Sequence, residues 1–181
     1  MQIRSWYWCA LATFFSLQPA HADPTRIGSM KTRFYQDDPH RLFVLTNFGT
    51  RVGKDFANAF HDRFIDIVKQ CHVDVDISMR TPLDLDEGIH LRKMKSFAPD
   101  SILRIARSGG QVDSGGNLYN VNLDIKLFDA KTNQPTWEAV IEYYEISDTP
   151  AMRGESLAID LSNEMKAAKV FNACDAATTA Q

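Results

Sequence analysis

The chain has 181 residues, 44% of them hydrophobic, and its 20 lysines and arginines against 23 aspartates and glutamates give a formal net charge of −3. A mildly acidic chain has no long-range attraction for nucleic acid or anionic lipid, so neither is expected as a partner. The length suits one domain with a substantial hydrophobic core. The sequence contains no internal repeat or low-complexity run that would indicate a second domain.

Residues 1–22 have the pattern of a cleaved secretory signal peptide. Arg4 supplies the positive charge, residues 6–17 the short apolar run, and residues 20–22 an A-x-A cleavage site. The apolar run is shorter than the roughly 20 residues that a membrane-spanning helix needs. We therefore expect an exported chain that begins near Asp23, has no transmembrane segment after cleavage and resides in the periplasm, with secretion as the second choice.

The expected mature chain keeps two cysteines, Cys71 and Cys174, because Cys9 lies within the signal peptide. Two cysteines in one domain of an oxidising compartment predict a disulfide bond, and two separate buried thiols are the alternative. The bridge would close a loop of about 100 residues and contribute about 4 kcal/mol in the chain-entropy model.

The first part of the expected mature chain is polar and then becomes apolar. Residues 23–41 contain several breakers and predict an extended N-terminal arm, in which residues 30–35 suit an edge strand. Residues 42–48 form a continuous apolar run typical of a buried strand. Residues 52–71 predict a long helix whose apolar stripe is Phe56, Phe60, Phe64, Ile67 and Cys71. Such a stripe is typical of a core that packs on a sheet, and a lipid pocket along it is the alternative.

Residues 72–80 alternate between apolar and polar side chains, as a strand with one buried face does. The polar side includes His72, Asp74 and Asp76, whose imidazole and carboxylate groups suit zinc or manganese. A further ligand would have to come from elsewhere, and the sequence offers no second pair of this kind. The alternative interpretation is a solvated sheet face.

The next segments predict a short helix, a strand and a loop. Residues 84–97 suit a helix with acidic side chains in its first turn and basic ones in its last, which complements the helix dipole. Residues 101–107 suit a strand. The glycine-rich residues 108–116 lead into another strand, whereas a phosphate-binding loop must lead into a helix, so we interpret them as a hairpin loop.

Residues 119–145 predict a long antiparallel hairpin with one buried and one wet face. The wet face is the candidate surface for a partner: Asn120, Asn122, Asp124, Lys126, Glu142 and Tyr144. Residues 155–171 predict the last helix and residues 175–181 a flexible tail. If the two long helices lay side by side and parallel on one face, their terminal cysteines would meet.

These elements predict an α+β fold in a single domain over residues 42–174. We expect a two-layer sandwich with a mainly antiparallel sheet of four to five strands, and two long helices and one short helix on one face.

Three stretches of sequence also carry a resemblance: LFVLTNFG…FANAFHDRFIDIV, APDSILRIA and LDIKLFDAKTNQPTWEAVIEY. They resemble small periplasmic accessory domains found near the bacterial outer membrane. These include the lipopolysaccharide-assembly lipoprotein, the penicillin-binding-protein activator lipoproteins and the amino-terminal domain of the Tol system's periplasmic component. The resemblance implies a non-enzymatic protein that contacts other proteins or envelope polymers. No catalytic residue carries over, and no cysteine follows the cleavage site to carry a lipid anchor.

We therefore expect a non-catalytic binding or assembly accessory protein of the periplasm, without a cofactor, whose partner is an envelope protein or polymer. One alternative is an exported metal-dependent hydrolase using His72, Asp74 and Asp76, although neither a G-x-S-x-G nor an H-E-x-x-H motif is present. The other alternative is a carrier of a small ligand such as a lipid.

Overall fold

The computed structural model describes residues 25–35, 37–49, 52–81, 84, 86, 88–112, 118–144, 149–171 and 174. The expected signal peptide, the expected tail and residues 113–117 of the glycine-rich connection lie outside these ranges. The elements in chain order are β1 (Thr25–Lys31), β2 (Arg41–Asn47), α1 (Lys54–Gln70), β3 (Asp74–Met79), α2 (Gly88–Phe97), β4 (Ser101–Val112), β5 (Leu118–Asp129), β6 (Pro135–Tyr144) and α3 (Pro150–Ala167).

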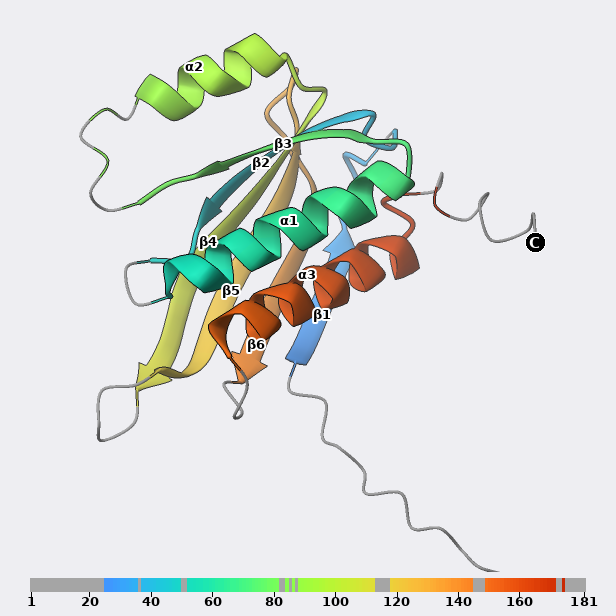
Figure 1. Ribbon diagram of the computed structural model, residues 1–181. Coiled ribbons are helices and arrows are strands. Elements are labelled where there is room, and N and C mark those ends of the chain that lie inside the picture. The colour runs from blue at the N-terminus through green and yellow to red at the C-terminus, as the bar shows by residue number, and fades with distance from the viewer. Residues whose placement is uncertain are drawn as a thin grey trace, which may run out of the picture.

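The six strands form one mixed sheet in the order β1-β6-β5-β4-β2-β3 (Figure 1). The pairs β1–β6, β6–β5 and β5–β4 are antiparallel, whereas β4–β2 and β2–β3 are parallel. The expected number of four to five strands is therefore wrong, and the sheet, although three of its five pairings are antiparallel, is partly parallel. Parallel neighbours need a crossover connection, and α1 and α2 supply the two crossovers.

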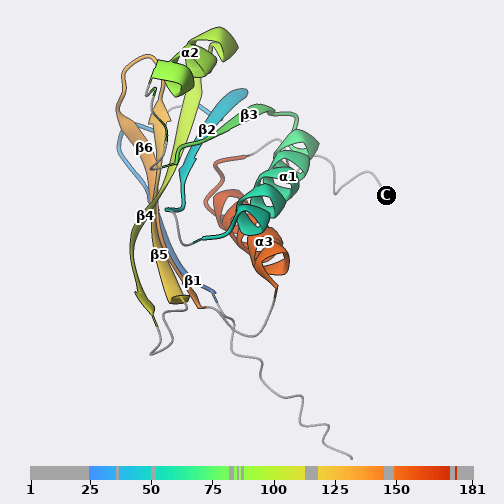
Figure 2. The same cartoon turned by 60° about the vertical axis from the view of Figure 1, so that its left-hand side comes forward.

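The helices cover both faces of the sheet. α1 and α3 lie side by side on one face, called here the inner face, and α2 lies apart from them (Figures 1 and 2). On β2, Leu42 and Val44 belong to the core under α1 and α3, but the intervening Phe43 meets Phe97 of α2, with ring centroids 6.2 Å apart. Because neighbouring strand residues point to opposite faces, α2 covers the opposite, outer face.

The expectation of three helices on one face is thus also wrong, for a topological reason. The chain moves from β2 to β3 in one direction along the sheet and then back across β2 to β4. Strand–helix–strand crossovers between parallel strands are right-handed, so a reversal of direction requires the second helix on the opposite face.

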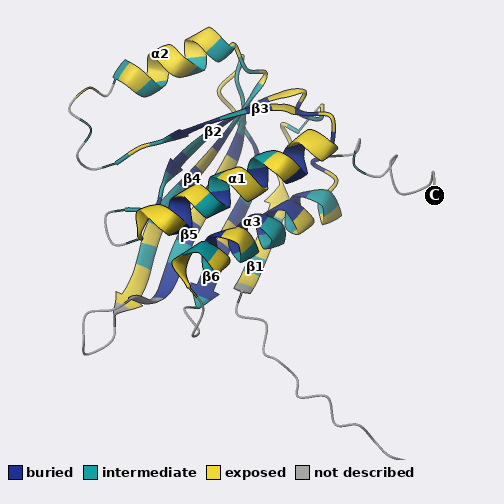
Figure 3. Ribbon diagram, in the orientation of Figure 1, coloured by how far each residue is buried: buried dark blue, intermediate teal, exposed yellow. Residues whose placement is uncertain are grey.

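The core forms between the inner face and the two long helices (Figure 3). The predicted apolar stripe of α1 is part of this core, and its residues Phe60 and Phe64 are fully buried. The predicted buried face of the hairpin is confirmed at Val121, Leu123, Ile125, Leu127, Trp137, Ala139, Ile141 and Tyr143.

Several element boundaries differ from the sequence-based expectation. The N-terminal edge strand is β1, which pairs with β6 along Thr25–Lys31, so this segment belongs to the sheet and is not an extended arm. β4 continues through Gly109 and Gly110 as a strand, with a register shift after Arg107. α3 begins earlier than predicted, at Pro150, where the side chain of Thr149 accepts a hydrogen bond from the Met152 backbone N–H.

A disulfide bond joins Cys71 and Cys174, whose Cα atoms are 4.3 Å apart and whose sequence separation is 103. Cys71 is the C-cap of α1, and Cys174 follows α3. The two helices run in the same direction, so their C-terminal ends lie together, in the arrangement that the sequence suggested (Figure 1).

Within the described residues, no helix is both long enough and apolar enough to cross a membrane.

Candidate functional site

The residues predicted to contact a partner lie on the outer face of the sheet, on the adjacent strands β5 and β6. The register places Asn122 opposite Glu142 and Lys126 opposite Glu138. Asp124 and Lys126 are exposed, whereas Glu142 and Tyr144 are partly covered. This part of the outer face is not covered by α1 or α3, which pack on the inner face.

Asn120 departs from the expected wet position, because only 4% of its surface is exposed. Its side-chain oxygen accepts a hydrogen bond of 2.7 Å from the backbone N–H of Gln111, and its amide nitrogen lies 3.3 Å from Glu142 Oε1. These contacts link β5 to both neighbouring strands, so Asn120 supports the sheet.

The outer face also carries exposed apolar side chains. Val140, on the interior strand β6, is 57% exposed, and Met30 on β1 is 63% exposed. Val140 lies opposite Gly28 and Met30 opposite Glu138, so the two apolar side chains are diagonal neighbours on adjacent strands. We call Met30, Gly28 and Val140 the β1–β6 patch.

Charged side chains of both signs surround the β1–β6 patch. Lys126 pairs with Glu138 at 3.2 Å, and the guanidinium of Arg26 lies 5.7 Å from the centroid of the Tyr144 ring. Exposed pairs of this kind contribute at most about 1 kcal/mol to stability. Because these contacts are weak, the side chains can exchange them for contacts with a partner.

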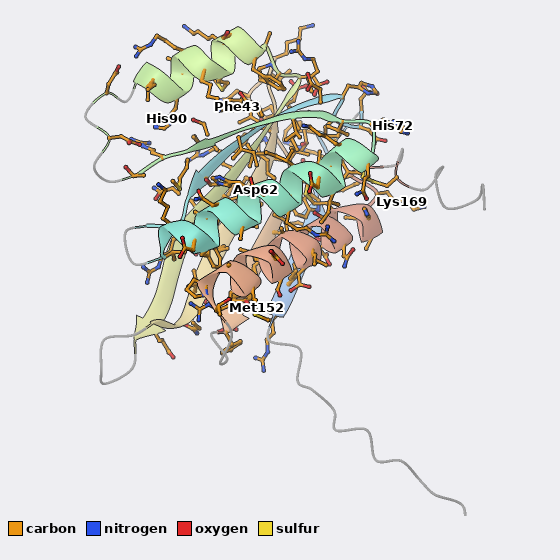
Figure 4. All side chains as sticks on the ribbon, viewed as in Figure 1. Phe43, Asp62, His72, His90, Met152 and Lys169 are labelled. Atoms are coloured by element: carbon orange, nitrogen blue, oxygen red, sulfur yellow. A yellow bond between two sulfur atoms is a disulfide. The ribbon has the colours of Figure 1, made fainter. Side chains whose placement is uncertain are left out.

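Within the part of the chain that the structure describes, the candidate metal ligands do not form a joint site with a further ligand. His72 lies in the turn between α1 and β3 with a φ of 58° and is exposed (Figure 4). Asp74 is 3.5 Å from Arg41, and Asp76 is 2.9 Å from Lys93 of α2, so each carboxylate has a cationic neighbour. Among the described residues, no group of three or more His, Cys, Asp or Glu side chains is arranged to hold a metal ion.

A chain of hydrogen bonds that the sequence pattern did not predict joins three residues between β3 and α2. Ser78 Oγ lies 2.8 Å from His90 Nδ1, and His90 Nε2 lies 2.9 Å from Asp84 Oδ2. Asp84 also accepts hydrogen bonds from the backbone N–H and the hydroxyl of Thr81. The Thr81 backbone N–H, followed by the His90 and Thr81 side chains, holds the pKa of Asp84 below its usual value. We call Ser78, His90 and Asp84 the α2 clamp.

The α2 clamp contains the residue types of a serine hydrolase triad, but its geometry suits a structural role. Ser78 is only 8% exposed. The imidazole bonds the serine through Nδ1 and the carboxylate through Nε2, which is the reverse of the usual triad. A neutral ring with its proton on Nε2 satisfies all three groups, so the clamp fastens α2 to β3. The sequence placed Asp84 in the first turn of the helix, whereas α2 begins at Gly88.

A hollow at one end of the sheet has a volume of about 600 Å³ and is bordered by four aspartates, Asp37, Asp38, Asp100 and Asp129. Three of them accept local hydrogen bonds: Asp38 from Tyr35, Asp100 from the backbone of residues 40–41, and Asp129 from Thr132. These carboxylates therefore fix the surrounding loops.

His61 is a partly buried histidine of α1 that no candidate site uses. Its Nε2 lies 2.9 Å from the hydroxyl of the fully buried Thr46, and the rings of Phe48 and Phe60 are nearby. Burial lowers the pKa of His61 to about 4, against the smaller raising effect of Asp62.

This shift predicts a pH-dependent stability. Between pH 6.5 and about 4 the unfolded chain binds a proton at His61 that the folded chain does not, so the free energy of unfolding falls as the pH falls through that range. Because the ring is partly exposed, we expect a loss of about 2 kcal/mol. Urea unfolding of the wild type and a His61→Gln variant at pH 7 and pH 4 measures it. A variant that loses as much stability as the wild type would contradict the prediction.

Comparisons with known proteins identify the fold. No family model and no curated protein sequence matches the chain. Among solved structures, it is similar to a PelC dodecamer from Paraburkholderia phytofirmans, with a TM-score of 0.52 at 12% identity over 76% of this chain and 96% of that one. It also matches the lipoprotein GNA1162 of Neisseria meningitidis, with a TM-score of 0.42 at 12% identity over 71% and 99% of the two chains. A third match, the protein XCC0632 of Xanthomonas campestris, has a TM-score of 0.38 at 9% identity over 82% and 93%.

Proposed function

We propose that this protein is a non-catalytic binding or assembly accessory protein of the bacterial periplasm, and that it contacts its partner through the outer face of the sheet. The observation that carries the proposal is the β1–β6 patch, because Val140 is 57% exposed on an interior strand of the sheet. Val140 adjoins the 63% exposed Met30, and exposed apolar side chains that form a patch rimmed by polar residues mark candidate contact surfaces.

The surroundings of the patch support the proposal. Protein interfaces have an apolar centre and a polar rim, and here Arg26, Glu138, Glu142 and Lys126 form a rim of both charge signs. The expected signal peptide and the disulfide bond favour an oxidising compartment. The similarly folded PelC is a dodecamer, which supports an assembly role in which other copies of this chain are candidate partners.

Photocrosslinking in the native cell envelope tests the proposal. A photoreactive amino acid replaces Val140 in one variant and Met152 in the matched control, because Met152 is 53% exposed but lies on α3, away from the outer face (Figure 4). We expect a defined crosslinked product at position 140, whose mass also distinguishes another copy of the chain from a different protein, and little product at position 152.

Equal crosslinking at both positions, or defined products at position 152 alone, would contradict this assignment of the surface. Both variants must first show the thermal unfolding midpoint of the wild type, which is expected because both side chains are more than half exposed.

A further inference from the structure

Two adjoining hollows lie on the sheet near β2 and β4, away from the proposed partner surface, and the first of them is roofed by α2. The first has a volume of about 190 Å³ and is apolar, with Phe43, Leu45, Leu91 and Met94 in its wall. The second has a volume of about 50 Å³ and is bordered by Asn47, Arg80 and Arg104. Leu45 and Arg80 border both hollows, so the two adjoin.

The strand register gives the two hollows a common floor. Phe43, Leu45 and Asn47 are alternate residues of β2 and face outward together. Leu45 lies opposite Arg104 on β4 and opposite Ser78 on β3. The floor from Phe43 to Asn47 is about 13 Å long at roughly 3.3 Å per strand residue, and we call the two hollows above it the channel.

The roof of the channel is held in place by the α2 clamp. His90 borders the apolar hollow while bonding Ser78 of β3 and Asp84, and Figure 4 shows it with Phe43 between α2 and the strands. The clamp therefore keeps Leu91 and Met94 at a fixed height above the floor.

The charges at the small hollow favour an anion. None of its six lining residues is acidic, and two of them are arginines. On the neighbouring strand β5, Lys126 lies opposite Arg104 and Asp124 opposite Ala106, so their charges offset each other. Arg80 takes part in another interaction, and the Arg104 guanidinium lies 5.9 Å from the centroid of the Phe128 ring, so both arginines would bind an anion in addition to these contacts.

We infer that this channel binds a fatty carboxylate, with its acyl chain in the apolar hollow and its carboxylate between Arg104, Arg80 and the Asn47 amide. Asn47 Oδ1 accepts a hydrogen bond from the backbone of Gly49, which leaves its NH₂ group as the donor. The small hollow suits a carboxylate and is too small for a glycerophosphate headgroup. At roughly 30 Å³ per water-sized group, the apolar hollow holds about six chain atoms. This site goes beyond the proposed function, which uses a different part of the outer face.

NMR titration of the full mature chain with octanoate tests the inference. We expect shifts of the backbone signals of residues 43–47 and 91–94. Hexanoate should bind roughly 15-fold more weakly, at about fourfold for each methylene group. Octylammonium, with the same chain and the opposite charge, should bind at least about tenfold more weakly than octanoate because it cannot pair with an arginine.

Substitutions at the two ends of the channel test separately how each end contributes to octanoate binding. Arg104→Gln should weaken octanoate binding about tenfold, the loss expected for one charged hydrogen bond. Leu91→Ser should weaken it severalfold, and Leu91 is 47% exposed, so the change leaves the core intact. Lys95→Gln is the matched control, because it removes an exposed positive charge of α2 that borders neither hollow, and it should bind octanoate as the wild type does.

Three outcomes would overturn the inference. They are equal binding of octylammonium and octanoate, unchanged octanoate affinity in Arg104→Gln, and signal shifts outside the channel. Tighter binding of an acetylated leucyl-leucine than of octanoate would assign the channel to the carboxyl end of a peptide instead. The crosslinking at position 140 is independent of all these results.

Discussion

Replacing Gly154 by alanine is expected to lower the free energy of unfolding by roughly 3 kcal/mol. Gly154 is a buried residue of α3 at its contact with α1. A Cβ atom there would collide with the backbone carbonyl oxygen of Phe56 and would lie 3.0 Å from the backbone nitrogen of Phe60. Backbone atoms of a helix cannot move aside as a side chain can, so the two helices would have to separate.

The usual preference of helices for alanine over glycine, up to about 1 kcal/mol, is too small to offset this collision. Urea unfolding measures the change as a lower midpoint. The matched control is Gly28→Ala on β1, where an added Cβ has no heavy atom within 4 Å and the stability should change by less than about 0.5 kcal/mol. A Gly154→Ala variant as stable as the wild type would show that α1 and α3 are farther apart than the structure has them.

Removing the disulfide bond by the double change Cys71→Ala and Cys174→Ala is expected to cost roughly 4 kcal/mol. The bond spans 103 positions, and its loss frees the unfolded chain to adopt many more conformations. Because the uncrosslinked unfolded chain also exposes more surface, the dependence of the unfolding free energy on urea concentration should become steeper.

A reducing agent should destabilise the wild type by a similar amount and leave the double variant unchanged. Titration of the denatured, unreduced wild-type protein should detect no free thiol. Two free thiols per chain would contradict the presence of the bond.

The local pattern of the sequence was sufficient for the elements and for most of the core. The two-residue alternation of the hairpin gave its buried face correctly from Val121 to Tyr143, and the helical spacing of Phe56, Phe60 and Phe64 gave the inner stripe of α1. Such patterns are reliable because a strand or helix repeats its geometry from residue to residue. The presence of two cysteines in a domain expected to be exported likewise predicted their disulfide bond.

The pairing of the strands was beyond that kind of reasoning. The sequences of residues 42–48 and 101–107 do not indicate that β2 lies between β3 and β4. Strand pairing depends on packing across the whole domain and not on the pattern within one strand. The position of α2 depends on this order through the handedness of the two crossovers. For the same reason the sequence left His90 without a partner, although the fold brings it to Ser78 and Asp84.

The sequence by itself therefore determined which side chains of the hairpin and of α1 face the core, because that depends only on the periodicity of strands and helices. Only the tertiary structure decided which surfaces remain exposed, because a face stays exposed only where no other element packs against it. The β1–β6 patch became visible only once β1 was placed beside β6. The channel formed only when the fold brought α2 over Leu45 of β2 and placed Arg104 of β4 beside Leu45.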